Sequence, residues 1–253
     1  MKKVSESDFI AYVSWAKENT SNTVYPLSIA EGFQTGDIYL DNEDNPRAVL
    51  FWHYCGFGYI SGTASDVFLR ELHSMMLSRH LSRRIVLISN DEEILRFFRN
   101  QGFQLTPRFE YSHPCTLPNS IPFHADRFRI KPIDRNILSG IEGRIVPSFS
   151  WDSNDRFLKR GFGYAALEGE TVCAVAFSSA ISSFEIDIGV ETREAYRKNG
   201  LAAAVAGKMC EQIIQMGKAP VWAHGAANLG SMHTALKCGF VKTKVTTLIK
   251  KPE

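Results

Sequence analysis

The clearest alternation of hydrophobic and polar positions lies in the second half of the chain. Two apolar runs, residues 162–167 and 171–179, are separated by Glu168-Gly169-Glu170. A short loop that contains glycine is typical of a β-hairpin, because glycine readily adopts the backbone conformations of tight turns. The pattern therefore predicts two antiparallel strands.

A third run, residues 184–190, predicts another strand. Successive side chains of a strand point to opposite faces, so every second residue lies on the same face. The apolar residues share one face: Ile186, Ile188 and Val190. The acidic and small residues share the other: Glu185, Asp187 and Gly189. Alternation alone leaves open which of the two faces is buried.

A helix is predicted after this strand. Apolar residues recur every four positions in an alanine-rich stretch, which is the spacing of one helical face. These residues are Leu201, Val205, Met209 and Ile213. Gly217 follows as an expected C-terminal cap, with Pro220 just beyond it.

The remaining patterns complete one α/β unit. We expect strands at residues 128–130, 221–223 and 246–249, and helices at 135–141, capped by Asp134, and at 228–237. With the elements above, the order is β-α-β-β-β-α-β-α-β. This order predicts an α/β fold in which helices flank a mixed central sheet.

The first half of the chain resembles the second when it is shifted by 137 positions. The shift aligns Gly102-Phe103 with Gly239-Phe240, and residues 85–88 with 222–225. A helix expected at 67–79 then overlies the alanine-rich helix. Two tandem copies of one unit explain this similarity. A coincidence between common helix-Gly-strand sequences is the alternative.

A proline-rich segment separates the two halves. Five prolines occur between residues 107 and 132, where few apolar positions are periodic. We place the boundary near residue 120, which predicts units of residues 1–120 and 121–253.

Composition indicates a globular protein with a cytoplasmic (cytosolic) location. Hydrophobic residues make up 44% of the chain and charged residues 22%. No apolar run reaches the roughly 18 residues of a membrane span, and the first residues lack the apolar stretch of a signal peptide. The five cysteines include no C-x-x-C pair, which favours buried free thiols over a metal site. We therefore expect neither a metal nor a membrane partner.

Charge is divided unevenly between the halves. Residues 1–125 carry 11 Lys and Arg against 14 Asp and Glu, a net charge of −3, and residues 126–253 carry 18 against 13, a net charge of +5. The second half therefore suits a small anionic ligand. Nucleic acid is not an expected partner, because no stripe of Lys and Arg with interleaved aromatic residues occurs.

The loop Arg197-Lys198-Asn199-Gly200-Leu201-Ala202 joins the third strand to the alanine-rich helix. Unpaired N–H groups of a first helical turn, aided by the helix dipole, can bind a phosphate. Glycine at this place lets the backbone approach closely, and Arg197 and Lys198 add positive charge. The shift by 137 puts Ile60 and Thr63 opposite Arg197 and Gly200, so we expect the first copy to have lost the ligand. An ordinary helix start is the alternative.

This loop resembles that of the GNAT superfamily of acetyl-CoA-dependent N-acetyltransferases. Their loop reads Q/R-x-x-G-x-G/A between the fourth strand and the third helix, and Arg197, Gly200 and Ala202 match its fixed positions. The longer string from Glu191-Thr192 to Ala202 resembles the zwittermicin-resistance-type branch, which implies an antibiotic-resistance-like activity. The resemblance covers about residues 126–250. It implies a GNAT-like mixed sheet, in which the N-terminal copy is degenerate.

The same resemblance implies the residues that bind acetyl-CoA. Backbone N–H groups of the loop would hold the pyrophosphate, and Val190 would hydrogen-bond the pantetheine arm. Asn228 matches an asparagine of the family's fourth helix, although asparagine is also a favoured N-cap residue. The implied set is Val190, Glu191, Thr192, Arg197, Lys198, Asn199, Gly200, Leu201, Ala202 and Asn228.

Acetyl transfer to an amine needs a base for the proton and a donor for the oxyanion. Asp187 and Glu185 are the base candidates, because the family commonly places an acid just upstream of Val190; solvated strand carboxylates are the alternative. His224 has a pKa range suited to proton relay, and a structural histidine is its alternative. The family often places a tyrosine where this chain has Ala235. The acid for the leaving thiolate is thus replaced, supplied elsewhere or unnecessary.

Trp151, Asp152 and Tyr164 are candidates for an acceptor pocket, with Trp151 as plain core as the alternative. The expected function is transfer of an acetyl group from acetyl-CoA to a primary amine of a small molecule, by direct attack in a ternary complex. A non-catalytic acyl-CoA sensor is the main alternative. A nucleotide-binding protein is disfavoured, because no G-x-x-x-x-G-K-[ST] or G-x-G-x-x-G follows a strand. The acceptor amine and the oligomeric state stay open.

Overall fold

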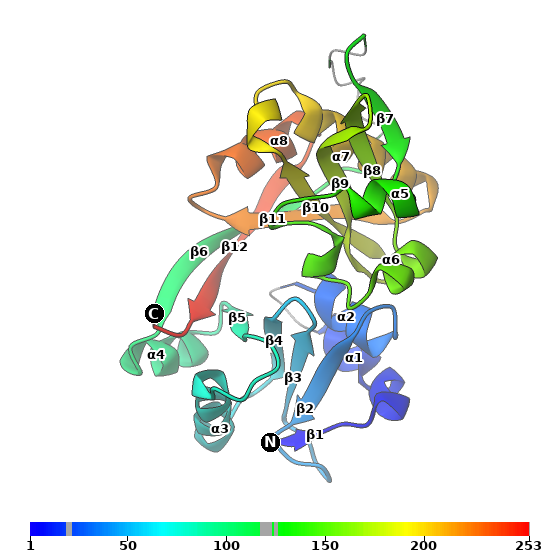
Figure 1. The fold of residues 1–253 in the computed structure, drawn as a ribbon. Coiled ribbons are helices and arrows are strands. Elements are labelled where there is room, and N and C mark those ends of the chain that lie inside the picture. Colours follow the sequence, from blue (N-terminus) through cyan, green and yellow to red (C-terminus); the bar gives the residue numbers. More distant parts are fainter. Residues whose placement is uncertain (19–21, 117–122, 124–125, 253) are drawn as a thin grey trace. The chain divides into compact units, whose positions relative to one another are not determined.

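The computed structural model describes residues 1–18, 22–116, 123 and 126–252. The chain forms two compact units (Figure 1). Unit 1 consists of Met1–Phe109 with Val245–Glu253, and unit 2 of Glu110–Lys244. The boundary predicted near residue 120 falls outside the described residues.

Unit 1 is a mixed sheet with helices on both faces. Its strands follow the order β1-β2-β3-β4-β5-β12, in which β4 and β5 are parallel and the pairs β2–β3 and β3–β4 antiparallel. Its elements are β1 (Lys2–Lys3), η1 (Glu6–Tyr12), α1 (Val13–Lys17), α2 (Val24–Ala30), β2 (Gly36–Leu40), β3 (Ala48–His53), β4 (Phe57–Gly62), α3 (Asp66–Leu77), β5 (Val86–Ser89), α4 (Glu92–Asn100) and the start of β6 (Gln104–Ser112).

Two apolar clusters cover the two faces of this sheet. Alternate residues of β3 divide between them, as period-two alternation requires. Leu50 and Trp52 pack with α3 and α4, whereas Val49 and Phe51 pack with α1 and α2. The α/β layering of unit 1 therefore follows directly from the apolar pattern of its strands.

Unit 2 repeats the same plan. Its strand order is β6-β11-β10-β9-β8-β7. Its elements are β7 (Arg129–Pro132), α5 (Arg135–Ser139), η2 (Pro147–Phe149), α6 (Asn154–Arg160), β8 (Gly163–Glu168), β9 (Thr171–Ile181), β10 (Glu185–Thr192), η3 (Glu194–Tyr196), α7 (Leu201–Gln215), β11 (Ala219–Gly225), α8 (Leu229–Lys237) and β12 (Val241–Lys250).

The predicted elements of the second half are present, together with one further α-helix, α6, and the short 3-10 turns η2 and η3. Asp134 caps α5 through Ile137 N as expected. The C-cap of α7 is Met216, and the predicted Gly217 follows it in a left-handed conformation, at φ +71°. The prediction missed α6, whose only fully buried residue is Phe157, so its sequence carries little apolar periodicity. The same element order in both units agrees with two tandem copies, and α4 and α8 are separated by the predicted 137 positions.

The last strand of the chain, β12, is divided between the two units. Strand β12 begins in unit 2, where Thr243 Oγ1 donates to Glu110 O on β6 at 3.3 Å. It ends in unit 1, where residues 247–249 pair antiparallel with residues 87–89 of β5. The closing strand, predicted at 246–249, is therefore longer than expected and is divided between the two units.

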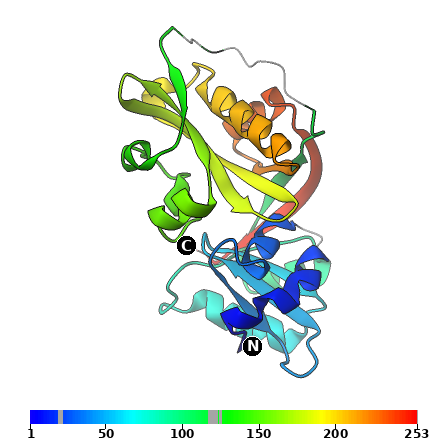
Figure 2. The same cartoon turned by 90° about the vertical axis from the view of Figure 1, so that its right-hand side faces the viewer.

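In unit 2, α7 packs against β8, β9 and β10 on one face of the sheet, and α5 and α6 lie on the other face (Figure 2). Trp151 and Phe157 approach each other edge to face, and Phe157 does the same with Phe177 of β9, so these rings fill the α6 face. Among the described residues, no helix has the length and apolar character needed to cross a membrane.

Candidate functional site

β10 and β11 are paired for only part of their length. Parallel pairing joins residues 185–187 to residues 219–221. Both strands are fully described, and the pairing between them stops at Asp187, although β10 continues to Thr192 and β11 to Gly225. The edge of β10 that faces β11 is therefore open over residues 188–192. An open strand edge can hydrogen-bond an extended ligand through its backbone.

The other edge of β10 changes register at the same point. Asp187 lies opposite Ala180 of β9 and Ile188 opposite Ser178, so Ser179 is an extra residue. Such irregularities turn a strand locally and are frequent beside active sites. The register change and the end of the parallel pairing coincide at Asp187.

The connection from β10 to α7 is a tight loop. Gly200 has φ +77° and ψ −4°, a left-handed conformation that glycine adopts readily. Lys198 is also left-handed, at φ +66°, which is uncommon for a residue with a side chain. The Asn199 amide donates to the carbonyl oxygens of Tyr196 and Arg197 at 3.1 and 3.3 Å and holds this shape. The side chains of Arg197 and Lys198 are exposed.

The first turn of α7 keeps its amide groups available. Gly200 is the N-cap and carries no side chain to accept from them, and the first helical bond in this turn runs from Ala204 N to Gly200 O at 3.1 Å. No side chain of the described residues accepts a hydrogen bond from the amides of residues 201–203. The helix start therefore combines unpaired donors, the positive end of the dipole and two nearby cations. This is the chemistry of a phosphate site.

The corresponding helix of unit 1 begins differently. Ser65 is the N-cap of α3, and its side chain accepts a hydrogen bond from Phe68 N at 3.2 Å. Only residues 63–65 connect β4 to α3, whereas residues 193–200 connect β10 to α7. The first unit therefore lacks the long loop and has a side chain bonded to its first turn.

Glu191 and Arg193, at the end of β10, contact the loop between α5 and η2. Glu191 Oε2 accepts from Arg144 N at 3.1 Å and from Ile145 N at 3.0 Å. Arg193 donates to Gly140 O at 3.0 Å. The structure thus joins Glu191, an implied cofactor residue, to the protein's own backbone on the α5 side.

The two candidate base residues lie where the parallel pairing ends. Asp187 is 6% exposed, and Glu185 is half-buried. Both precede the register change, so period-two alternation puts them on one face of β10. Their role as bases stays a prediction.

His224 is engaged at both ring nitrogens. Its Nδ1 lies 2.8 Å from Gly225 O, which can only accept, so Nδ1 carries the proton. Its Nε2 lies 3.0 Å from Tyr111 Oη, and in the neutral ring it accepts from that hydroxyl. The rings stack at 5.3 Å, and burial raises the pKa of Tyr111. These contacts are those of a structural histidine; a relay role stays a prediction.

The sequence model of the GNAT acetyltransferase family matches residues 15–249. The chain belongs to this family.

Individual relatives agree with the family assignment. A curated relative, the uncharacterized N-acetyltransferase YdfB of Bacillus subtilis, is 24% identical over 234 residues, which is 85% of each chain. A GCN5-related N-acetyltransferase-like protein from Streptococcus suis has the same fold, with a TM-score of 0.74, 23% identity, and coverage of 98% of this chain and 100% of that one. A tandem GNAT protein from the clavulanic acid biosynthesis pathway has a TM-score of 0.64 at 10% identity and covers 100% of this chain and 98% of its own.

Members of the GNAT family transfer an acetyl group from acetyl-CoA, so the family makes this chain an acyltransferase. Of the positions that the family uses, Asn228 is the N-cap of α8, and its Oδ1 accepts from Ser231 N at 3.0 Å. The N-cap interpretation is therefore realised in the structure, and contact with the cofactor stays a prediction. Ala235, at the place of the family's tyrosine, is fully buried.

The structure does not bring the three candidate acceptor residues together. Trp151 is 2% exposed on the α6 face, where its Nε1 donates to Ser178 O at 2.8 Å. Asp152 forms an ion pair with Arg156 at 3.1 Å. Tyr164 lies on the opposite face of the sheet, where its hydroxyl donates to Gln212 of α7 at 3.2 Å. Alternation along β8 and β9 separates them, because Gly163, not Tyr164, lies opposite Phe177.

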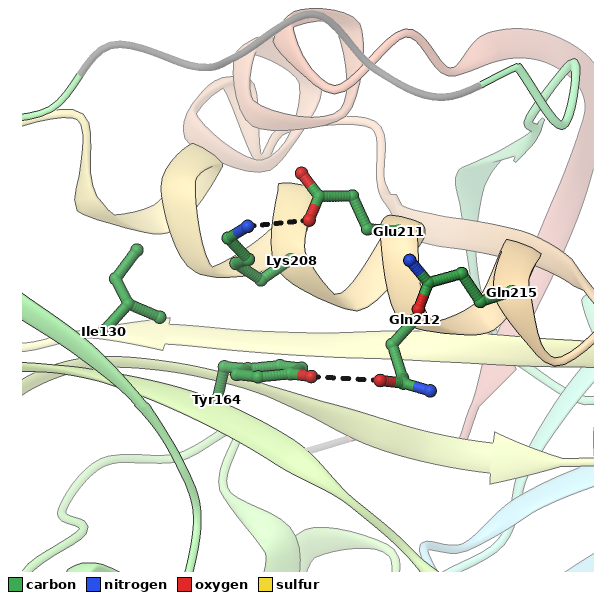
Figure 3. Close-up of a pocket in the computed structure, with 6 residues that line it drawn as sticks. All are labelled: Ile130, Tyr164, Lys208, Glu211, Gln212 and Gln215. Atoms are coloured by element: carbon green, nitrogen blue, oxygen red, sulfur yellow. Dashed lines mark hydrogen bonds and ion pairs between the residues drawn. The ribbon is translucent and has the colours of Figure 1, made fainter.

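Tyr164 lines a pocket of about 300 Å³ between α7 and strands β7 and β8 (Figure 3). Two side-chain interactions lie in its wall: the hydrogen bond from Tyr164 to Gln212, and the ion pair between Lys208 and Glu211 at 2.7 Å. Its lining residues are Ile130, Tyr164, Lys208, Glu211, Gln212 and Gln215. This pocket lies on the α7 face, away from the loop that Glu191 holds.

Sequence reasoning missed Tyr111 and the loop contacts of Glu191 and Arg193. Tyr111 is 113 residues from His224, so no local pattern could relate them. In the sequence, the local sign of the loop bound by Glu191 is Gly143, whose φ in the structure is +135°. Glycine occurs too commonly in loops to single out this one.

Proposed function

We propose that this GNAT acetyltransferase transfers an acetyl group from acetyl-CoA to a primary amine of a small molecule, by direct attack in a ternary complex. The uncapped first turn of α7 behind the left-handed Gly200 is the observation that carries the proposal. It supplies several backbone donors at one point, which is what a pyrophosphate needs.

In this proposal the cofactor lies along the open part of β10. The amides of residues 198–202 bind its pyrophosphate, with Arg197 and Lys198 adding charge. The backbone of Val190 hydrogen-bonds the pantetheine arm, because that edge of β10 has no strand partner. Asn228 contributes from the start of α8.

The chemical step needs an amine without its proton. Asp187 takes this proton, with Glu185 as the second candidate, because both lie where the two strands separate. A carboxylate that removes a proton acts at hydrogen-bond distance from the amine or through one water. His224 is a further proton acceptor in this scheme only if it exchanges a present hydrogen bond for one to the substrate.

The proposal assigns one cofactor site to each chain, in unit 2. Ser65 bonds to the first turn of the corresponding helix of unit 1, whose preceding connection is also shorter. Unit 1 is thus a degenerate copy without a cofactor loop. The sequence around Arg197 further suggests the zwittermicin-resistance-type branch, with a small molecule that carries a primary amine as acceptor.

A second candidate function is a non-catalytic acyl-CoA sensor. The buried Ala235 favours it, because the family's usual acid for the leaving thiolate is absent at that position. A sensor would bind acetyl-CoA and still leave its thioester intact.

Release of free CoA thiol separates the two functions. The purified chain is incubated with acetyl-CoA and a panel of small primary amines, and thiol is measured with a chromogenic trap. Thiol release that depends on an amine, with a matching acetylated product by mass spectrometry, supports the enzyme. Tight acetyl-CoA binding with no release for any amine supports the sensor.

A further inference from the structure

The end of β10 holds a loop of the α5–η2 connection through two charged side chains. Glu191 accepts from two consecutive backbone amides, Arg144 N and Ile145 N, at 3.1 and 3.0 Å with a single oxygen, Oε2. Arg193 donates to Gly140 O at 3.0 Å and pairs with Glu142 at 3.4 Å. Two residues that flank Thr192 thus hold residues 140–145 at both ends.

The geometry of the loop is built around the Glu191 side chain. Gly143 has φ +135°, and a Cβ on it would lie 2.5 Å from Cγ of Glu191. A side chain at residue 143 would therefore be strained by the backbone conformation and would force Glu191 or the loop to move. Hydrogen bonds from amides to a carboxylate are stronger than bonds between neutral groups, so this contact orders the loop effectively.

The far end of the loop is also attached to the sheet. It continues into η2 (Pro147–Phe149) and then Trp151, whose Nε1 donates to Ser178 O on β9. A Cβ on Gly189 would meet the Phe177 ring at 2.6 Å, so this glycine also faces the packed α6 side. The loop therefore borders the face of β9 and β10 that lies opposite α7.

We propose that Glu191 and Arg193 are positioning residues for this loop, and that the loop forms the acceptor-side wall of the site. The inference rests on the proposed function, in which acetyl-CoA takes the open edge of β10 and the loop end of α7. The same segment then contacts both substrates: the backbone of β10 binds the cofactor, and Glu191 together with Arg193, just after the strand, orders the wall beside the amine. Glu191 acts on the amine through the loop and makes no contact with the cofactor.

The test compares Glu191→Ala, Glu191→Gln and the control Glu170→Ala. Glu170 is an exposed acid of the β8–β9 hairpin, so its removal changes charge equally without touching the loop. Hydrogen exchange of the peptide that contains residues 141–146 is the first measurement. Glu191→Ala should raise exchange of the Arg144 and Ile145 amides about tenfold or more, because each loses its acceptor. Glu191→Gln should restore part of the protection, because its amide oxygen still accepts.

The second measurement separates the two substrates. Acetyl-CoA affinity should change less than about twofold in all three variants, whereas the KM for the amine should rise about tenfold in Glu191→Ala through loss of orientation. Unchanged hydrogen exchange of the loop in Glu191→Ala would overturn the positioning role of Glu191. A loss of acetyl-CoA affinity with an unchanged amine KM would overturn it too, because Glu191 would then be a cofactor ligand.

Gly143→Ala provides a second variant that keeps the carboxylate. Its Cβ displaces the loop from Glu191, so it should reproduce the faster exchange and the raised amine KM. Should wild type acetylate no amine, the proposed function fails on its own account. The exchange data would still decide whether Glu191 orders the loop, and exchange in Arg193→Ala, which removes the bond to Gly140 O and the ion pair with Glu142, would decide the same for Arg193.

Discussion

Ser65 and Gly200 occupy the same place in the two units, as N-caps of the helices that follow the fourth strand. Ser65 accepts a hydrogen bond from Phe68 N with its side chain, whereas Gly200 has no side chain and is left-handed at φ +77°. One helix start is therefore capped by a side chain, and the other leaves its first amides without a side-chain acceptor.

We expect one acetyl-CoA to bind per chain. Of the two corresponding helices, α3 and α7, only α7 combines an uncapped first turn with exposed cations just before it, Arg197 and Lys198. Calorimetric titration of the purified chain measures the stoichiometry. Two equivalent sites would show that the first unit has kept its cofactor site.

Replacing Gly200 with valine should weaken acetyl-CoA binding by at least about tenfold, since a left-handed conformation costs a residue with a side chain roughly 1–2 kcal/mol. The added Cβ also keeps phosphate from approaching the backbone. Titration with acetyl-CoA gives the affinity, and thermal unfolding reports the fold. Gly169→Val is the matched control, because Gly169 is left-handed at φ +60° in the β8–β9 hairpin. Equal affinity in Gly200→Val and wild type would refute the loop assignment.

Asp187→Asn should lower turnover far more than it weakens acetyl-CoA binding. Removal of a general base typically costs about a hundredfold to ten-thousandfold in rate. Steady-state kinetics and titration on the same variant measure the two effects separately.

Glu185→Gln is the companion variant, because both carboxylates precede the register change of β10. The pH–rate profile should lose its acidic limb in the variant that removes the true base. Full activity in both variants would show that neither carboxylate is the general base, which would leave water or His224 as the base.

Acid should destabilise unit 1 through His53. This side chain is fully buried, and burial, followed by the nearby positive charge of Arg83, lowers its pKa to about 3. Below pH 6.5, the ordinary pKa of histidine, His53 binds a proton in the unfolded chain but stays neutral in the folded chain. The free energy of unfolding therefore falls progressively as the pH drops from 6.5 towards 3. At pH 4 it is lower by about 3 kcal/mol.

Urea unfolding at pH 7 and pH 4 checks this loss. His53→Asn should show a smaller loss than wild type, because its oxygen can accept from Cys55 N as Nδ1 does at 3.2 Å, without titrating. His80→Asn, at an exposed histidine, should behave as wild type does. An equal pH dependence in all three proteins would rule out His53 as the cause.

Local sequence was sufficient to predict those features that depend on a single helix, hairpin or cap. The four-residue apolar spacing from Leu201 to Ile213 predicted α7, and the glycine at 200 predicted its start, because both depend on the helix alone. The hairpin at Gly169 and the caps Asp134 and Asn228 were predictable for the same reason. The repeat at 137 positions also belongs to the sequence, since it compares residue types without requiring contacts.

Only the tertiary structure decided which distant residues meet. The end of pairing at Asp187 depends on how β10 and β11 separate, and the contact between Tyr111 and His224 joins strands from opposite halves of the chain. Tyr164 and Trp151 looked like neighbours in one pocket, yet alternation and sheet packing put them on opposite faces. Periodicity specifies a strand and its two faces, but which face each helix covers is set by packing between elements far apart in sequence. The sequence therefore determined the loop for which we propose phosphate binding, and only the fold decided which side chains surround it.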